Sequence, residues 1–209
     1  TFFSIFCHAT IGSPGDDYIG SDSVNQLGYW YNSDNMDGSG IPPSWGPNPP
    51  AAGMLLLQGA LKKSPLTNYK MTSFVALLGS ASCEGFPNGM YQNEVHNLLS
   101  GHKKDGSNFM NPSTVPRKPS KYCFSGYPEY FGGWTDPNWI HNCGIDSGQT
   151  GVVNDTLRYF LMNSGSNDLS VSPTDTQKII IAQFAARGTD NRNAITRLKM
   201  SARSVQMFY

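Results

Sequence analysis

The chain has 209 residues, a formal net charge of zero, and charged side chains at only 14% of its positions. This length is enough to bury one sizeable core, and the lack of a basic excess excludes the electrostatic footprint of proteins that bind nucleic acid or an anionic membrane surface. Glycine (22 residues) and proline (14 residues) are abundant while glutamate is rare, a balance that favours strands and turns over helices.

The first part of the chain has the pattern of strands separated by turns. Residues 2–6 and 27–31 are rich in aromatic residues and are predicted to form strands. Residues 41–50 contain five prolines, which cannot donate a backbone N–H to a sheet, so this stretch is expected to cross the surface. The apolar run at residues 54–57 then predicts a buried strand.

The second part mixes strands with a short helix. The β-branched and aromatic residues at 69–78 predict another strand, whereas residues 88–100 place their apolar side chains on one face at helical spacing. Residues 103–122 are polar and proline-rich and predict a long loop. Residues 157–162 and 178–186 carry the strongest strand signals that follow it.

The chain closes with apolar residues at helical spacing from Ile195 to Tyr209, after Asp190 or Asn191 as the cap. We therefore expect a mainly β fold: a single antiparallel β-sandwich-like domain over residues 1–209, with a short mid-chain helix and a C-terminal helix packed on the sheet. No apolar run is long enough for a transmembrane helix. The chain begins at Thr1 without a charged leader, and we expect a processed piece or an excerpt of a longer exported protein.

The four cysteines are widely spaced and never form a C-x-x-C pair, which argues against a zinc or thioredoxin-like site. They are Cys7, Cys83, Cys123 and Cys143. Their even number and the loop-rich composition favour disulfides formed outside the cytoplasm, with the pairing left open. The alternative is that they are buried free thiols.

Oxygen-bearing side chains gather in two loops near the N-terminus and suggest calcium. The candidate ligands are Asp16, Asp17, Asp22, Asp34, Asn35 and Asp37. Ca²⁺ takes about six to eight hard oxygen donors in flexible geometry. Residues 34–38 lack the full spacing and the closing glutamate of an EF-hand loop, and aspartate and asparagine also stabilise turns by bonding to nearby backbone. Calcium binding and turn stabilisation are therefore alternatives.

Aromatic residues are dense on the glycine- and proline-rich loops between residues 122 and 139. The candidate sugar-stacking residues are Tyr127, Tyr130, Trp134 and Trp139. Exposed rings can stack on sugars while the neighbouring carboxylates, Glu129 and Asp136, accept hydrogen bonds from hydroxyls. The alternative, which the sequence favours, is that the rings pin a long loop onto the sheet.

No motif for catalysis is present: the sequence contains no G-x-S-x-G, no H-E-x-x-H, no P-loop and no G-x-G-x-x-G. The four histidines do not have the spacing of metal ligands. A glycosidase needs only two carboxylates that converge in space, so hydrolysis of polysaccharides is left open.

The stretch from Thr174 to Gly188 (TDTQKIIIAQFAARG) resembles a module of large Bacteroidetes-type surface proteins that are exported by type IX secretion. The likeness extends upstream in the order of that family's motifs, over Asp16–Asp22 (DDYIGSD), Leu27–Asn32 (LGYWYN) and Asn48–Gly53 (NPPAAG). One departure is clear, because Ser166 and Asn167 stand where the family usually has Pro-Phe.

The resemblance implies an extracellular or cell-surface location and a β-rich build, with no known activity. It also implies O-glycosylation at Asp-Ser/Thr-apolar triplets, which this chain matches at Ser23 and Thr156.

We expect a non-enzymatic structural or assembly module of a cell-surface or extracellular structure, such as a filament or surface-layer subunit, which self-associates or binds other subunits through sheet edges. The alternatives are a carbohydrate-binding or adhesion module and a domain of a secreted polysaccharide hydrolase. No nucleic-acid partner is expected, and Ca²⁺ is the cofactor that the residues suggest.

Overall fold

The computed structural model describes residues 1–13, 15–38, 44–63, 65–78, 84–86, 91–138, 140–141, 151–152 and 157–209. Its strands are β1 (Phe2–Ala9), β2 (Asp17–Asp22), β3 (Leu27–Asn32), β4 (Met36–Asp37), β5 (Gly46–Pro47), β6 (Ala51–Gln58), β7 (Leu61–Lys63), β8 (Leu66–Asn68), β9 (Met71–Leu78), β10 (Phe109–Asn111), β11 (Lys118–Ser120), β12 (Ile140–His141), β13 (Gly151–Val152), β14 (Arg158–Gly165) and β15 (Ile180–Ala186). Its helices are α1 (Gln92–Leu99), the 3₁₀ turns η1 (Pro128–Tyr130) and η2 (Asp136–Asn138), and α2 (Asn191–Phe208).

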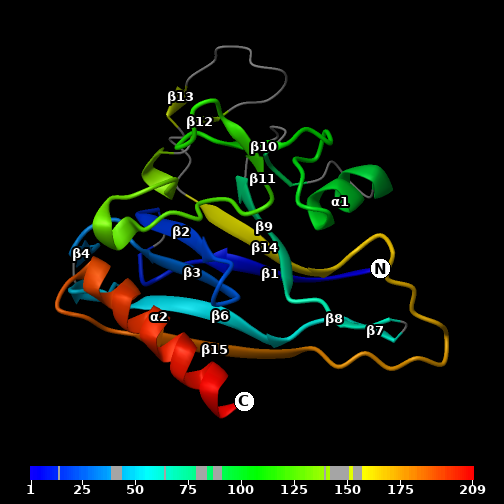
Figure 1. Cartoon of the computed structure of the whole chain (residues 1–209). Helices are drawn as coiled ribbons and strands as arrows, with labels where there is room; N and C mark the ends of the chain where they lie inside the picture. Colours follow the sequence, from blue (N-terminus) through cyan, green and yellow to red (C-terminus); the bar gives the residue numbers. More distant parts are fainter. Residues whose placement is uncertain are drawn as a thin grey trace.

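Two antiparallel sheets make up the body of the fold. The three-stranded sheet has the order β1-β14-β9, and the four-stranded sheet has the order β15-β6-β3-β2. Helix α2 lies across the outer face of the four-stranded sheet (Figure 1), where its main sheet contacts are with β3, β6 and β15. The predicted mainly β, sandwich-like fold with a C-terminal helix is confirmed.

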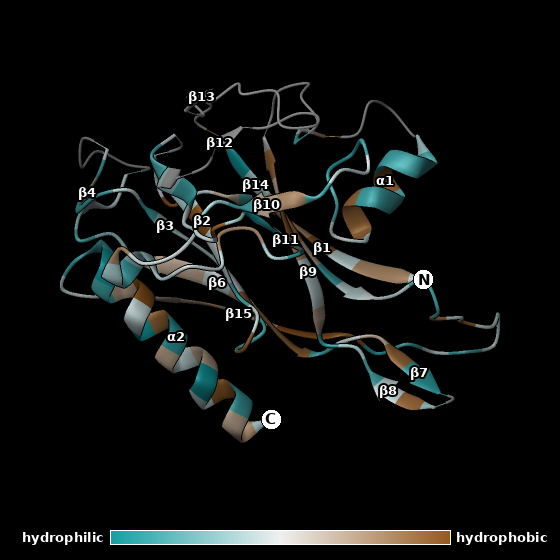
Figure 2. Cartoon of the chain, turned by 45° about the horizontal axis from the view of Figure 1, so that its top comes forward, coloured by the Kyte–Doolittle hydropathy of each residue, from teal (hydrophilic) through white to brown (hydrophobic). Residues whose placement is uncertain are grey.

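The four-stranded sheet is buried on both faces. Successive residues of β6 divide between two cores, because neighbouring side chains of a strand point to opposite faces: Leu56 faces the three-stranded sheet and Leu55 faces α2. The core between the sheets includes Phe74 and Phe160, whose rings stack with centroids 4.8 Å apart. Along α2, apolar and polar residues alternate in the amphipathic pattern of a surface helix (Figure 2).

The edge strands β2 and β9 are covered by the segment at residues 121–136. At β2, Ile19 N–H donates to Asp136 Oδ2 (3.0 Å) and Ser21 N–H donates to the Phe124 carbonyl (3.1 Å). At β9, Phe74 N–H donates to the Lys121 carbonyl (2.8 Å), and the Phe74 carbonyl accepts from Cys123 N–H (2.9 Å). The segment is anchored by a buried ion pair in which Arg158 Nε donates to both oxygens of Asp136 at 3.1 Å. Outward backbone groups of Ile19, Ser21 and Phe74 at these two edges are therefore satisfied within the chain.

Several predicted elements differ from the structure in their extent. The strand expected at residues 54–57 spans Ala51–Gln58, and the one expected at 157–162 spans Arg158–Gly165. The long loop expected at residues 103–122 is wrong in part, since β10 and β11 pair within it. Asp190 is the cap of α2, where its Oδ1 accepts the N–H groups of Arg192 (3.0 Å) and Asn193 (2.7 Å).

No helix in the described ranges is both long and apolar enough to span a bilayer. The N-terminal end of β1 is tied to the chain after β14, because the Thr1 ammonium donates to the carbonyls of Ser166 (3.1 Å) and Leu169 (2.6 Å).

The packing of α2 on the sheet gives a direct test of the fold. Leu198 is 0% exposed and Met200, on the same helix, is 60% exposed. We expect Leu198→Ala to lower the free energy of unfolding by about 2–5 kcal/mol, because it leaves a cavity between α2 and the sheet. Met200→Ala is the matched control, with an expected change within about 0.5 kcal/mol. Urea unfolding followed by circular dichroism measures both, and equal losses would contradict this packing.

Candidate functional site

Strand β15 forms the edge of the four-stranded sheet opposite β2, and its outer side is open. The N–H of Leu56 donates to the Gln26 carbonyl (3.0 Å), so Leu56 bonds toward β3. Backbone groups alternate in direction along an antiparallel strand, so Leu55 bonds toward β15, where it pairs with Ala182. It follows that Ile181, Gln183 and Ala185 direct their N–H and C=O groups away from the sheet.

These outward groups have no hydrogen-bond partner within the part of the chain that the structure describes. The same residues are exposed on their side chains, with Ile181 at 43%. Residues 179–186 contain neither a charge nor a proline. The flanking Arg187 is turned back onto the chain, where its guanidinium donates to the carbonyls of Asn48 (2.8 Å) and Pro47 (2.7 Å). Strand β15 therefore lacks the charged residues and prolines that commonly prevent an edge strand from pairing with another chain.

One flank of α2 is occupied by contacts with the rest of the chain. Arg203 Nε and Gln206 Nε2 donate to Asn25, in the turn between β2 and β3, and Lys199 Nζ donates to Glu129. Because β15 and β2 are the opposite margins of the sheet, the other flank of α2 is on the β15 side.

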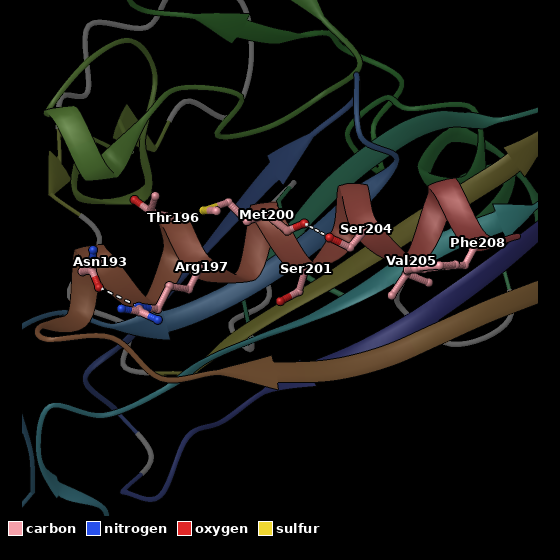
Figure 3. Close-up of a pocket in the computed structure, with 8 residues that line it drawn as sticks. All are labelled: Asn193, Thr196, Arg197, Met200, Ser201, Ser204, Val205 and Phe208. Atoms are coloured by element: carbon pink, nitrogen blue, oxygen red, sulfur yellow. Dashed lines mark hydrogen bonds between the residues drawn. The ribbon is translucent and has the colours of Figure 1, made fainter.

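A groove of about 650 Å³ follows this other flank. It is lined by Asn193, Thr196, Arg197, Met200, Ser201, Ser204, Val205 and Phe208. In Figure 3, Arg197, Ser201 and Val205 are on the lower side of the helix, where β15 runs beneath it. The groove combines apolar and hydroxyl-bearing side chains beside an open strand edge, an arrangement that can receive an added strand.

A second recess lies at the start of α2, beside the turn that contains η1. The turn closes through hydrogen bonds from Tyr127 N–H to the Gly132 carbonyl (2.6 Å) and from Gly132 N–H to the Tyr127 carbonyl (3.1 Å). Lys199 Nζ holds the turn on α2 by donating to Glu129 Oε1 at 2.8 Å, with Lys199 side chain 9% and Glu129 side chain 7% exposed. Lys199 Nζ also lies 5.1 Å from the ring centroid of Tyr29.

This recess is a pocket of about 680 Å³ with mainly polar walls. Its lining residues are Ser33, Asp34, Asn35, Glu129, Tyr130, Asp190, Asn191, Arg192, Asn193 and Thr196. Glu129 was expected as an acceptor for sugar hydroxyls, but its pairing with Lys199 was not predicted. Lys199 and Arg192 were not predicted as site residues, because the turn and the helix are far apart in the sequence and no motif links them.

The predicted sugar-stacking residues have different surroundings. Tyr127 and Tyr130 are 59% and 74% exposed on the η1 turn. Trp134 is buried, with its ring edge-on to Phe124 at 5.5 Å, so it pins the loop and is not an exposed stacking ring. Trp139 lies outside the described residues. Phe131, which was not predicted, is 77% exposed, and the Arg192 guanidinium lies 3.3 Å from its ring centroid.

All six predicted calcium ligands accept hydrogen bonds from backbone N–H groups. Carboxylate or amide oxygens accept backbone N–H groups as follows: Asp17 from Ile11 (2.6 Å), Asp22 from Asn25 (3.0 Å), Asp34 from Met36 (2.7 Å), Asn35 from Asn191 (2.7 Å), and Asp37 from Ser13 (3.0 Å) and Trp45; the main-chain carbonyl of Asp16 accepts from Ser33 (2.7 Å). Among the described residues, no three Asp, Glu, His or Cys side chains are grouped so as to hold a metal ion. Local turns account for Asp22 and Asp34, whereas the other four residues bond to backbone groups six or more positions away. Calcium binding stays a prediction.

Asp17 is buried at 3% exposure and its Oδ1 has no hydrogen-bond partner; Asp37 is buried as well, and Asp16 Oδ1 also lacks a partner. Burial raises the pKa of Asp17 from 3.8 to about 7, the Ile11 N–H opposes this rise, and the charges of Asp16 and Asp37 add to it.

Two of the four predicted disulfide cysteines are free thiols. Cys7 and Cys123 are both buried and unbonded, so the disulfide prediction is wrong for them. They belong to the core between the sheets, where cysteine acts as a small apolar residue. Burial raises the pKa of the Cys7 thiol to about 12 and raises that of Cys123 as well, which keeps both unreactive. Cys83 and Cys143 lie outside the described residues.

The two predicted glycosylation positions remain predictions. Ser23 lies in the turn between β2 and β3 and is half-buried, and Thr156 lies outside the described residues.

Searches of protein-family models, curated proteins and solved structures found no match to this chain.

The position of Asp17 predicts how stability depends on pH. A carboxyl group whose pKa is raised on folding stabilises the fold while it is protonated, and this contribution is lost as pH rises through the folded pKa, here from about pH 4 to about pH 8. We expect Asp17→Asn to remove this loss, so that the variant gains stability over the parent as pH rises, by at most about 4 kcal/mol.

Urea unfolding at a series of pH values measures the effect. Asp34→Asn, at an exposed position of the neighbouring turn, is the control and should follow the pH profile of the parent. If the Asp17→Asn profile also parallels the parent's, the proposed ionisation of Asp17 is wrong.

Proposed function

We propose that this chain is a non-enzymatic assembly module whose β15 edge pairs with an extended strand of a second copy. The observation that carries the proposal is the open outer edge of β15, where Ile181, Gln183 and Ala185 offer unpaired backbone groups. An edge of this kind is a template for strand addition, in which backbone hydrogen bonds supply affinity and side-chain pockets supply selectivity.

The contrast among the edges supports a functional role for β15. Residues 121–136 bond to the edges of β2 and β9 through three backbone hydrogen bonds and one from Ile19 N–H to the Asp136 carboxylate. Leaving one edge open and uncharged exposes a protein to uncontrolled aggregation unless a partner covers that edge. A partner strand that covers this edge in the assembly removes that exposure, so the edge then needs neither a charge nor a proline.

The groove beside α2 supports the same role. A strand added to β15 continues the four-stranded sheet beyond its margin, and alternate side chains of that strand point toward α2. Val205 and Phe208 offer apolar contact there, while Arg197 and Ser201 offer hydrogen bonds. The helix would thus cover one face of the added strand as it covers β15.

The resemblance to modules exported by type IX secretion supports an extracellular or cell-surface location for this assembly. An exported structural subunit also needs no catalytic motif, which agrees with the sequence.

Gln183→Pro tests the proposal, because it removes an outward N–H without removing a hydrogen bond to β6. We expect the parent to self-associate as its concentration rises from micromolar to millimolar and Gln183→Pro to stay monomeric, as measured by sedimentation velocity. Gln183→Thr is the matched control: it keeps the N–H and a β-forming side chain, and should associate like the parent.

Circular dichroism and thermal unfolding of Gln183→Pro check that the sheet is intact. A parent that is monomeric throughout, or a folded Gln183→Pro that associates as the parent does, would exclude assembly through β15.

A further inference from the structure

Glu129 has an unused hydrogen-bond acceptor beside the η1 pocket. Its Oε1 accepts from Lys199 Nζ at 2.8 Å, and its side chain is only 7% exposed. Its Oε2 is buried and has no hydrogen-bond partner. Glu129 lines the pocket, so a ligand bound there can supply the missing donor.

An aromatic surface lies next to this acceptor. Tyr130 lines the pocket and is 74% exposed, so its ring is open to an incoming ligand. The ring is carried on a turn that is fixed to α2 by the buried Lys199–Glu129 pair. A fixed and exposed ring beside hydrogen-bonding groups suits the apolar face of a sugar.

The charges of the pocket favour a neutral ligand. Asp34, Glu129 and Asp190 line it, which opposes an anion. Arg192 also lines it, and Lys199 lies behind Glu129, which opposes a cation. The amide groups of Asn35 and Asn193 add both donors and acceptors to the walls. This mixture of donors and acceptors matches the hydroxyl groups of an uncharged carbohydrate.

We propose that this pocket is a binding site for a neutral sugar residue, which stacks on the Tyr130 ring and donates a hydroxyl hydrogen bond to Glu129. The pocket adjoins the groove at the start of α2, where Asn193 and Thr196 line both, whereas Glu129 and Tyr130 line the pocket and not the groove. The chain would then bind a glycan beside η1 and a second copy of itself along β15.

The test uses the methyl glycosides of glucose, galactose, mannose and N-acetylglucosamine, with binding measured by saturation-transfer NMR and titration calorimetry. We expect at least one of them to bind the parent. Tyr130→Ala should weaken that binding about tenfold, because it removes the stacking surface. Glu129→Gln should also weaken it several-fold, since a neutral amide replaces a charged acceptor.

Tyr91→Ala is the matched control, because Tyr91 is 62% exposed and does not line the pocket. It should bind the sugar as the parent does, and so should Gln183→Pro, which separates this site from the β15 edge. Thermal unfolding checks that each variant is folded. The proposal is overturned if no glycoside binds, if Tyr130→Ala binds as tightly as the parent, or if sulfate or Ca²⁺ displaces the sugar.

Discussion

Burial of the four-stranded sheet on both faces is the constraint on which the rest of the fold depends. Strand β6 places Leu56 against the three-stranded sheet and Leu55 against α2, so neither face can be left to solvent without exposing a row of apolar side chains. One helix is narrower than four strands, and the three-stranded sheet is also narrower. Coverage is therefore complete at β3, partial at β6 and least at β15, whose outer residues stay accessible.

Buried ion pairs place the loops that finish the structure. The Asp136–Arg158 pair fixes the segment that closes two strand edges, and the Lys199–Glu129 pair fixes the η1 turn on α2. Such pairs add little net stability, because removing two charges from water costs about as much as their attraction returns. Their geometric demands are strict, however. Burying an acceptor without a hydrogen-bond donor, such as Glu129 Oε2, lowers the stability of the fold by a further 1–3 kcal/mol or so. Such a cost is understandable if the oxygen binds a ligand.

The sequence pattern was sufficient to predict helices and strands in which buried and exposed side chains alternate with a regular period. The alternation around residues 178–186 and the helical spacing from Ile195 onward identify β15 and α2, because each has one face on a core. The short pair β10 and β11 has no such pattern, since its residues lie in a polar, proline-rich stretch. The burial of Cys7 and Trp134 depends on how the chain packs in three dimensions. The pocket beside Glu129 depends on contacts between segments that are distant in the sequence. Neither can be derived from spacing alone.

The open edge of β15 also limits the symmetry of any assembly that uses it. If β15 of one copy pairs antiparallel with β15 of another, the contact is self-complementary and both β15 edges are occupied. Growth then stops at a twofold dimer with a continuous eight-stranded sheet. If β15 instead accepts a different strand of its neighbour, every copy both gives and receives, and the array continues until a ring closes or a fibre forms. The shape of the assembly is thus decided by which strand meets β15.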